Sequence, residues 1–148
     1  LRIESTAVDI DADMENRLTS PLFDGSEVLL DITLGKAEHV SLTLAYGLEK
    51  TVFSYDRANQ VMTIDRTGMK QGGRGVRRFK MFVDRVLSLQ LFVDRTAVEA
   101  FFQHGEEAAS FLVFPEKNIR PELRLEADAP LETVTGRVWE LDAFRFNP

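Results

Sequence analysis

The sequence predicts an all-β protein of a single domain, folded as a sandwich or a barrel of antiparallel strands. The chain has 148 residues, which is the length of one ordinary domain and is enough to bury a core without disulfide bonds. Apolar and polar residues alternate with period two along most of the chain, as they do in half-buried strands. Turn residues separate the alternating runs at intervals of about 8–12 residues, which is typical of sandwiches and barrels.

The expected strands follow one another with short turns between them. The first run, "STAVDIDAD", alternates strictly, and the later runs are rich in Val, Leu, Thr and Tyr, which favour extended backbone. The best helical candidate is residues 11–18, but its 3.6-residue period is weak and the surrounding β pattern argues against it. The expected strands are residues 5–13, 27–35, 39–47, 50–56, 60–66, 87–93, 98–103, 108–114, 122–126 and 133–146.

Two successive hairpins are expected in "LSLQLFVDRTAVEAFFQHGEEAASFLVFP", residues 87–115. Asp94 suits the first position of a type I turn, which places Val93 opposite Val98 and gathers only apolar residues on one face. The second turn is expected at residues 104–107, where Gly105 can supply an unusual φ angle. The other expected pairs are Leu91 with Ala100, Leu89 with Phe102, Phe102 with Ala109, Ala100 with Phe111, and Val98 with Val113. This apolar face is expected to form one wall of a sandwich core.

The opposite face of these hairpins mixes large apolar residues with an acid. Phe92, Phe101 and Leu112 are expected to surround Glu99 on it. A fully solvated face does not normally carry so many large apolar groups, so we expect another layer or a partner domain to cover part of it. A carboxylate held there needs a cation or backbone donors. We therefore expect Glu99 to pair with Arg95 or Arg124.

Paired acids raise the question of glycoside hydrolysis, because glycosidases use two carboxyl groups across the scissile bond. Asp94 and Glu99 are five residues apart, which makes a catalytic separation conceivable. However, a convex hairpin offers no cleft that would exclude water or bind a sugar ring. We therefore interpret Asp94 as a turn residue and assign no catalytic residue in the chain.

Composition excludes several further functions. The chain has no cysteine, which removes thiolate ligands and cysteine nucleophiles and favours a reducing compartment. Its net charge is −6, and the basic run "RGVRRFK" at residues 74–80 is too short for a nucleic-acid surface. His39 and His104 lack converging ligands, so no metal or cofactor site is expected. No apolar run is long enough to span a membrane, and Trp139 is expected to pack rather than to stack on a sugar.

The stretch "LQLFVDRTAVEAFFQHGEEAASFLVFP" resembles the C-terminal signature of glycoside hydrolase family 32, the family of invertases, sucrose-6-phosphate hydrolases, inulinases and fructanases. The upstream "YDRANQVMTIDRTG" and the closing "VWELDAFRF" are similar to neighbouring strands of that family. Gln103 and His104 stand where the family usually has Asn-Asp. The residues that carry the signature are Asp94, Arg95, Val98, Glu99, Phe101, Gly105, Glu106, Phe114 and Pro115.

The resemblance implies a concanavalin- or lectin-like jelly-roll sandwich that follows a catalytic five-bladed propeller. The propeller's Asn-Asp-Pro and Glu-Cys motifs are absent, and the chain begins at Leu1, so we interpret residues 1–148 as the C-terminal sandwich of a longer enzyme. The parent would hydrolyse β-fructofuranosyl bonds of sucrose, sucrose 6-phosphate or fructans with retention. The implied partner of the sandwich is that propeller, contacted through a face such as that of Phe92, Phe101 and Leu112, and a homodimer contact is also implied. The alternative is an autonomous carbohydrate-binding module, and the cytoplasm is favoured over secretion.

Overall fold

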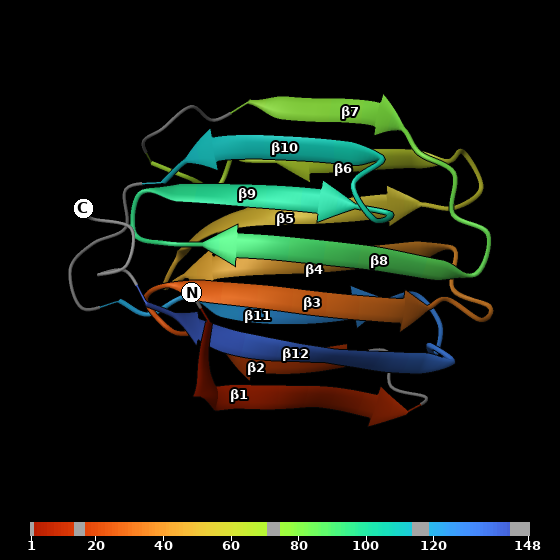
Figure 1. The fold of residues 1–148 in the computed structure, drawn as a ribbon. Helices are drawn as coiled ribbons and strands as arrows, with labels where there is room; N and C mark the ends of the chain where they lie inside the picture. Colours follow the sequence, from red (N-terminus) through yellow and green to blue (C-terminus); the bar gives the residue numbers. More distant parts are fainter. Residues whose placement is uncertain (1, 14–16, 71–74, 114–118, 143–148) are drawn as a thin grey trace.

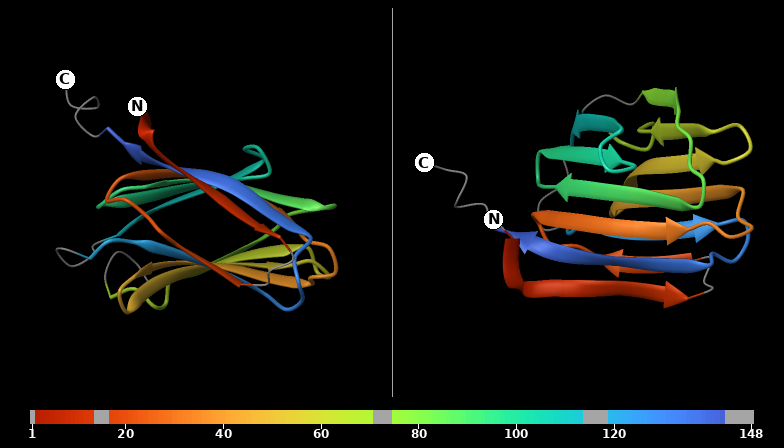
Figure 2. Two further views of the ribbon diagram at one scale, coloured as in Figure 1. Left: turned by 90° about the horizontal axis from the view of Figure 1, so that it is seen from below. Right: turned by 45° about the vertical axis from the view of Figure 1, so that its right-hand side comes forward.

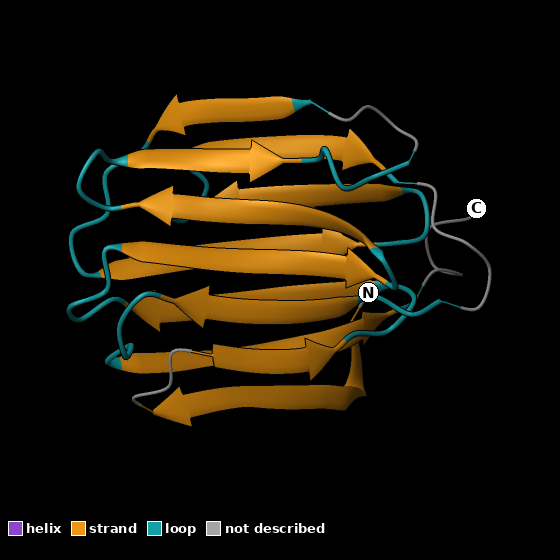
Figure 3. Ribbon diagram, turned by 180° about the vertical axis from the view of Figure 1, so that it is seen from behind, coloured by secondary structure: helices purple, strands orange, loops and turns teal. Residues whose placement is uncertain are grey.

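The computed structural model describes residues 2–13, 17–70, 75–113 and 119–142. These residues form twelve strands in two six-stranded antiparallel sheets, which pack face to face as a sandwich (Figures 1 and 2). The described residues are strands joined by loops and include no helix that could cross a membrane (Figure 3). The strands are β1 (Arg2–Asp13), β2 (Arg17–Pro21), β3 (Ser26–Thr33), β4 (His39–Tyr46), β5 (Glu49–Asp56), β6 (Val61–Asp65), β7 (Val76–Lys80), β8 (Val86–Val93), β9 (Ala97–Phe102), β10 (Glu107–Leu112), β11 (Glu122–Ala127) and β12 (Thr133–Leu141).

The sheet order explains how the chain closes its core. The first sheet has the order β1-β12-β3-β8-β9-β10, and the second has the order β2-β11-β4-β5-β6-β7. Strands from both ends of the chain therefore lie side by side in the first sheet, where β1 pairs with β12. The predicted all-β, two-sheet antiparallel sandwich is confirmed.

Apolar side chains from the two inner faces fill the space between the sheets. Phe53 of the second sheet and Phe102 of the first meet with ring centroids 6.0 Å apart, and both are almost fully buried. Tyr55 is also buried, and its hydroxyl donates to Met81 O at 2.7 Å and accepts from Val83 N at 3.1 Å. These two bonds tie the segment between β7 and β8 to β5.

The first of the two expected hairpins has the predicted register. Val93 lies opposite Val98, Leu91 opposite Ala100 and Leu89 opposite Phe102. Asp94 Oδ1 accepts the backbone N–H of Thr96 at 2.7 Å and that of Ala97 at 2.9 Å. The carboxylate thereby closes the turn, as expected of Asp in this position.

The predicted register of the second hairpin is wrong by two residues. Phe102 lies opposite Glu107 rather than Ala109, so that Ala100 faces Ala109 and Val98 faces Phe111. The turn begins one residue early because Gln103 leaves the pairing with φ 51°, followed by His104 with φ 59° and Gly105 with φ 91°. A slip of two residues keeps every side chain on its predicted face, so the apolar wall is preserved.

The sequence pattern misses two strands and extends others too far. Strands β2 and β7 are edge strands of the second sheet, where one side of the backbone has no neighbour in the sheet and apolar alternation is not required. Strand β7 is the charged run "VRRFK", which carries no apolar alternation. The helical candidate at residues 11–18, against which the β pattern argues, is strand where described, at residues 11–13 and 17–18. Residues 143–146 of the last expected strand lie outside the described residues.

Candidate interaction surface

The outer face of the first sheet carries the aromatic residues that the sequence places around Glu99. Phe92 of β8 and Phe101 of β9 are half-buried, and their rings meet edge to face with centroids 6.1 Å apart. Leu112 lies on the same side of β10, with 56% of its surface exposed. The row of Phe92, Glu99 and Ser110 across the strands separates Leu112 from Phe101. The structure therefore brings Phe92 and Phe101 into contact and leaves Leu112 apart at the sheet edge.

The expected ion pair of Glu99 is wrong. Arg124 belongs to β11 of the second sheet, and its Nε donates to Glu122 Oε1 at 2.6 Å. Glu99 and Arg95 are both exposed, and no hydrogen bond or ion pair joins them among the residues that the structure describes. The Glu99 side chain faces outward on β9 and is exposed, so the neighbouring aromatic rings do not cover it.

The buried acid of this face is Glu27 on β3, which lies opposite Phe92 in the sheet and is 5% exposed. Arg2 of β1 binds it with two parallel hydrogen bonds, Nε to Oε1 at 2.8 Å and Nη2 to Oε2 at 2.7 Å. Gln90 of β8 adds a donor at 3.1 Å from Oε2. The bonds from Arg2 hold the pKa of the Glu27 carboxyl below its ordinary value, against the opposing effect of burial. Bidentate geometry of this kind makes a strong charge-assisted pair.

Trp139 completes this cluster on the neighbouring strand β12. The Arg2 guanidinium lies 3.9 Å from the centroid of the indole ring, close enough for a cation–π interaction. The indole N–H donates to Glu4 Oε2 at 3.2 Å, and the side chain is 5% exposed. The predicted packing role of Trp139 is confirmed, and the group that covers its ring is the charged Arg2 guanidinium. We call Arg2, Glu27, Gln90 and Trp139 the outer-face cluster.

Sequence reasoning misses the outer-face cluster because its members come from four strands. The available signal is Glu27 at the start of the apolar run "SEVLLDIT", where an acid needs a partner. Nothing in the spacing identifies Arg2, which is 25 residues away and separated from β3 in the sheet by β12.

A hollow of about 200 Å³ adjoins the outer-face cluster. Its polar lining includes Asp31, Ser88 and Gln90, and Ser88 Oγ donates to Asp31 Oδ1 at 2.7 Å. His104, exposed as predicted, forms part of the rim. Gln103 holds the rim loop to β8, since its side-chain amide accepts from Ser88 N at 2.6 Å and donates to Val86 O at 3.0 Å. These bonds offset the cost of two consecutive non-glycine residues with positive φ.

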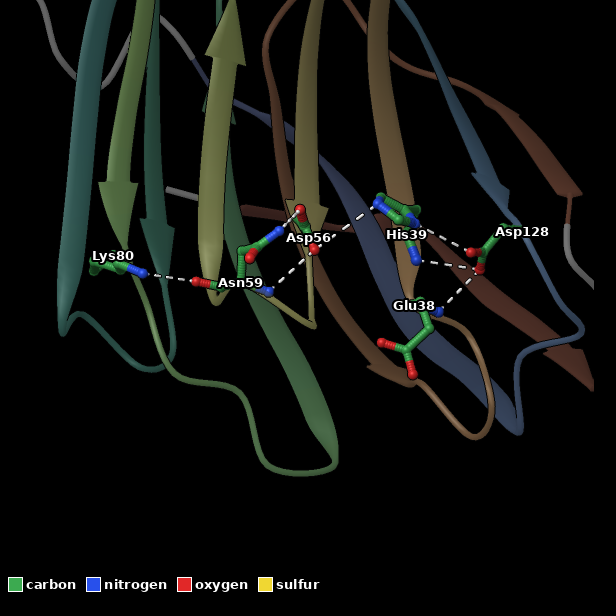
Figure 4. A network of polar contacts seen from close by, with 6 residues as sticks. All are labelled: Glu38, His39, Asp56, Asn59, Lys80 and Asp128. Carbon is green, nitrogen blue, oxygen red and sulfur yellow. Dashed lines mark hydrogen bonds and ion pairs between the residues drawn. The ribbon is translucent and has the colours of Figure 1, made fainter.

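A second polar network joins loops at one end of the second sheet (Figure 4). Asp128 Oδ1 accepts the backbone N–H groups of Glu38 and His39, and the His39 ring lies between Asp128 and Asp56, at 3.2 and 3.8 Å. The pKa of Asp128 is lowered chiefly by the hydrogen bond that it accepts from the backbone N–H of His39. The pKa of Asp56 is lowered chiefly by the hydrogen bond that it accepts from the side-chain amide of Asn59. This network fastens turns together, and within the described ranges no group of three or more acids and histidines could hold a metal.

The family-signature residues occupy both the core and the surface. Val98 is fully buried, Asp94 closes its turn, and Gly105 has the positive φ that a glycine tolerates. Arg95, Glu99 and Glu106 are exposed. Phe114 and Pro115 lie outside the described residues. Asp94 and Glu99 do not line the hollow on the outer face.

The architecture defines a galectin-like β-sandwich. A galectin from Caenorhabditis elegans superposes on 88% of this chain and 95% of its own length, with a TM-score of 0.63 and 10% identity. This likeness concerns the fold alone.

Residues 2–140 match the sequence profile described as "Glycosyl hydrolases family 32 C terminal". The chain therefore belongs to glycoside hydrolase family 32, as its C-terminal sandwich domain. It is 31% identical over 97 residues to a sucrose-6-phosphate hydrolase of Staphylococcus xylosus, covering 62% of this chain and 19% of that protein. An exo-inulinase from Aspergillus awamori has a similar structure (TM-score 0.75, 24% identity, 94% of this chain and 31% of that one). So does a sucrose-6-phosphate hydrolase from Lactobacillus gasseri (TM-score 0.70, 20% identity, 95% and 30%). The chain thus spans less than a third of the length of each of these relatives, in which the domain is one part of a larger polypeptide.

Proposed function

We propose that this chain is the non-catalytic sandwich module of a β-fructofuranosidase, and that it stabilises the catalytic propeller of the same polypeptide. The observation that carries the proposal is the family match over residues 2–140 together with the coverage of the relatives, which are named as enzymes and are about three times as long as this chain. The parent's reaction would be hydrolysis of a β-fructofuranosyl bond in sucrose, sucrose 6-phosphate or a fructan.

The outer face of the first sheet supports the proposed contact with the propeller. A face turned to water seldom carries a pair of half-buried aromatic rings beside a buried, bidentate ion pair. Phe92 and Phe101 supply the apolar part, and the outer-face cluster supplies a rigid polar part next to it. Apolar centres with polar surroundings are typical of protein interfaces. The same face would serve a homodimer contact if a second sandwich occupied it.

The test compares three polypeptides: residues 1–148, the full parent chain, and the parent chain ending before Leu1. We expect the full chain to release reducing sugar from sucrose or inulin and residues 1–148 to release none. The shortened chain should lose activity on heating at a lower temperature than the full chain does. Hydrolysis by residues 1–148 alone, or equal heat resistance of the two longer polypeptides, would contradict the proposal.

The second candidate, an autonomous carbohydrate-binding module, has one supporting observation, which is the hollow lined by Asp31, Gln90 and Phe101. The aromatic residues best suited by type to stack on a sugar, Trp139 and the tyrosines, are instead almost fully buried. Calorimetric titration of residues 1–148 with sucrose and inulin separates the two candidates, because only a binding module should release heat.

A further inference from the structure

The open edge of the sandwich, where β10 and β7 end their sheets, holds two arginines in an unusual place. These strands lie next to each other at the top of Figure 1 and in the right panel of Figure 2. Arg66 follows Met62 and Ile64 at the inward positions of β6, and Arg77 lies directly opposite Ile64 on β7. Both arginines therefore occupy positions that would hold core side chains in the middle of the sheet.

Each guanidinium crosses from the second sheet to the backbone of β10. Arg66 Nη2 donates to Leu112 O at 3.0 Å, and Arg77 Nη1 donates to Ala108 O at 3.1 Å. The Arg66 guanidinium also lies 4.6 Å from the centroid of the Phe111 ring. A cavity of about 180 Å³ separates the two sheets between these arginines. The arginines therefore bridge an edge that apolar side chains do not close.

The carbonyls that the arginines occupy belong to the unpaired side of β10. Val113 N donates to Thr96 O at 2.9 Å, which shows that odd-numbered residues of this segment bond to β9. In an antiparallel strand the alternate residues then direct both N–H and C=O away from that neighbour. Ala108, Ser110 and Leu112 accordingly face the open edge, and the guanidinium groups occupy the first and last of their carbonyls.

We propose that Arg66 and Arg77 keep the β10 edge closed to strand addition by a second copy of this chain. An exposed edge is a template for pairing with another chain, and inward-pointing charges are one of the devices that blunt such an edge. With the carbonyls of Ala108 and Leu112 both bonded to arginines, Ser110 is the one edge-facing residue of β10 left with both its N–H and C=O open to a new strand. One residue is too short to form a ladder of hydrogen bonds with that strand. Without the guanidinium groups, β10 of one copy can pair antiparallel with β10 of another around Ser110, in a closed two-fold arrangement. This inference does not depend on the proposed function.

The test removes both guanidinium groups in the variant Arg66→Gln/Arg77→Gln. The control, Arg78→Gln/Arg85→Gln, removes the same charge from exposed positions that make no hydrogen bond to β10 within the described residues. Light scattering over a range of concentrations measures the dimer dissociation constant. We expect the first variant to dimerise at least about tenfold more tightly than the control and the unchanged chain. Equal association of all three proteins would overturn the proposal.

A proline at Ser110 tests whether the new contact uses the β10 edge. Ser110→Pro removes an edge-facing N–H without touching the bonds to β9, and proline is tolerated on edge strands. Added to the double glutamine variant, it should restore the association of the unchanged chain, whereas a dimer that persists would contradict the proposed surface. If the double variant fails to fold, as judged by circular dichroism, the single exposed replacement Arg77→Gln takes its place. That variant should also associate more tightly than Arg78→Gln, and equal association would again overturn the proposal.

Discussion

The ion pair between Arg2 and Glu27 offers a direct test of how the outer face of the first sheet is held. Replacing Arg2 by Met keeps an unbranched stem on Trp139 and removes both hydrogen bonds to Glu27. The Glu27 side chain is 6% exposed, so its carboxylate would stay buried with the amide of Gln90 as its remaining donor. Breaking a fully buried pair costs about 3–5 kcal/mol. Because the Arg2 side chain is 36% exposed, we expect a smaller loss of about 2–3 kcal/mol in the free energy of unfolding.

The pair of Arg137 and Asp9 provides a matched control on the same sheet. Its Nε–Oδ1 distance is 2.6 Å, but its side chains are 49% and 70% exposed. Exposed pairs contribute about 0–1 kcal/mol, so Arg137→Met should cost no more than that. Urea unfolding, followed both by Trp139 fluorescence and by circular dichroism, gives the free energies.

The double variant Arg2→Met/Glu27→Gln completes the cycle. Removing both charges leaves no buried carboxylate without its cation, so we expect it to be more stable than Arg2→Met alone. The cost of the double variant should therefore be smaller, by at least about 1 kcal/mol, than the sum of the costs of Arg2→Met and Glu27→Gln alone. If Arg2→Met costs no more than Arg137→Met, or if the costs in the cycle are strictly additive, the ion pair of Arg2 and Glu27 does not hold this face.

Three further predictions concern the sandwich itself. Tyr55→Phe should lower the free energy of unfolding by about 1–3 kcal/mol, because it leaves a buried carbonyl and a buried N–H unbonded. The control Tyr46→Phe should change that free energy very little, since the buried Tyr46 hydroxyl has no partner among the described residues. Gly136→Ala should destabilise the protein by about 1–3 kcal/mol or more in thermal unfolding, because its Cβ would overlap the carbonyl oxygen of Leu29 on β3. The folded-state pKa of Asp128 is depressed, so its stabilisation is present above the ordinary carboxyl pKa and is lost as the pH falls through the folded value. The variant Asp128→Asn should consequently show a shallower loss of stability below about pH 4, and an unchanged acid slope would contradict this assignment.

The regular part of the fold follows from the sequence because alternation and turn chemistry act locally. Asp94 and the apolar face of β8 and β9 are enough to establish one hairpin in its correct register. The predicted register of the next hairpin is wrong because the side-chain amide of Gln103 forms hydrogen bonds with the backbone of β8. No local sequence pattern indicates these bonds. Strand β7 is missed since its inward positions include Arg77, which closes an edge instead of a core.

The candidate site is less predictable than the fold because it depends on pairs that are distant in the sequence. The aromatic contact between Phe92 and Phe101 follows from the hairpin register, and the sequence places both residues correctly on the outer face. The cation expected at Glu99 is found instead at Glu27, to which Arg2 donates two hydrogen bonds. Arg2 reaches this place because the last strand, β12, pairs with β1, which sets Arg2 over Trp139. Pairing between strands from opposite ends of a chain leaves no periodic signal.

The face of Phe92 and Phe101 is proposed to hold the catalytic domain of the parent enzyme, and one comparison of two polypeptides tests this contact. The most direct measurement is the effect of Phe92→Asp on heat stability, compared between residues 1–148 and the full parent chain. In residues 1–148 the variant loses the ring contact with Phe101 and places a third carboxylate between Glu27 and Glu99, so the unfolding midpoint should already fall in the isolated domain. In the full chain the charge would lie in the interface, and the midpoint for loss of fructosidase activity should fall by about 5 °C more. Equal shifts in the two polypeptides would show that this face does not hold the catalytic domain.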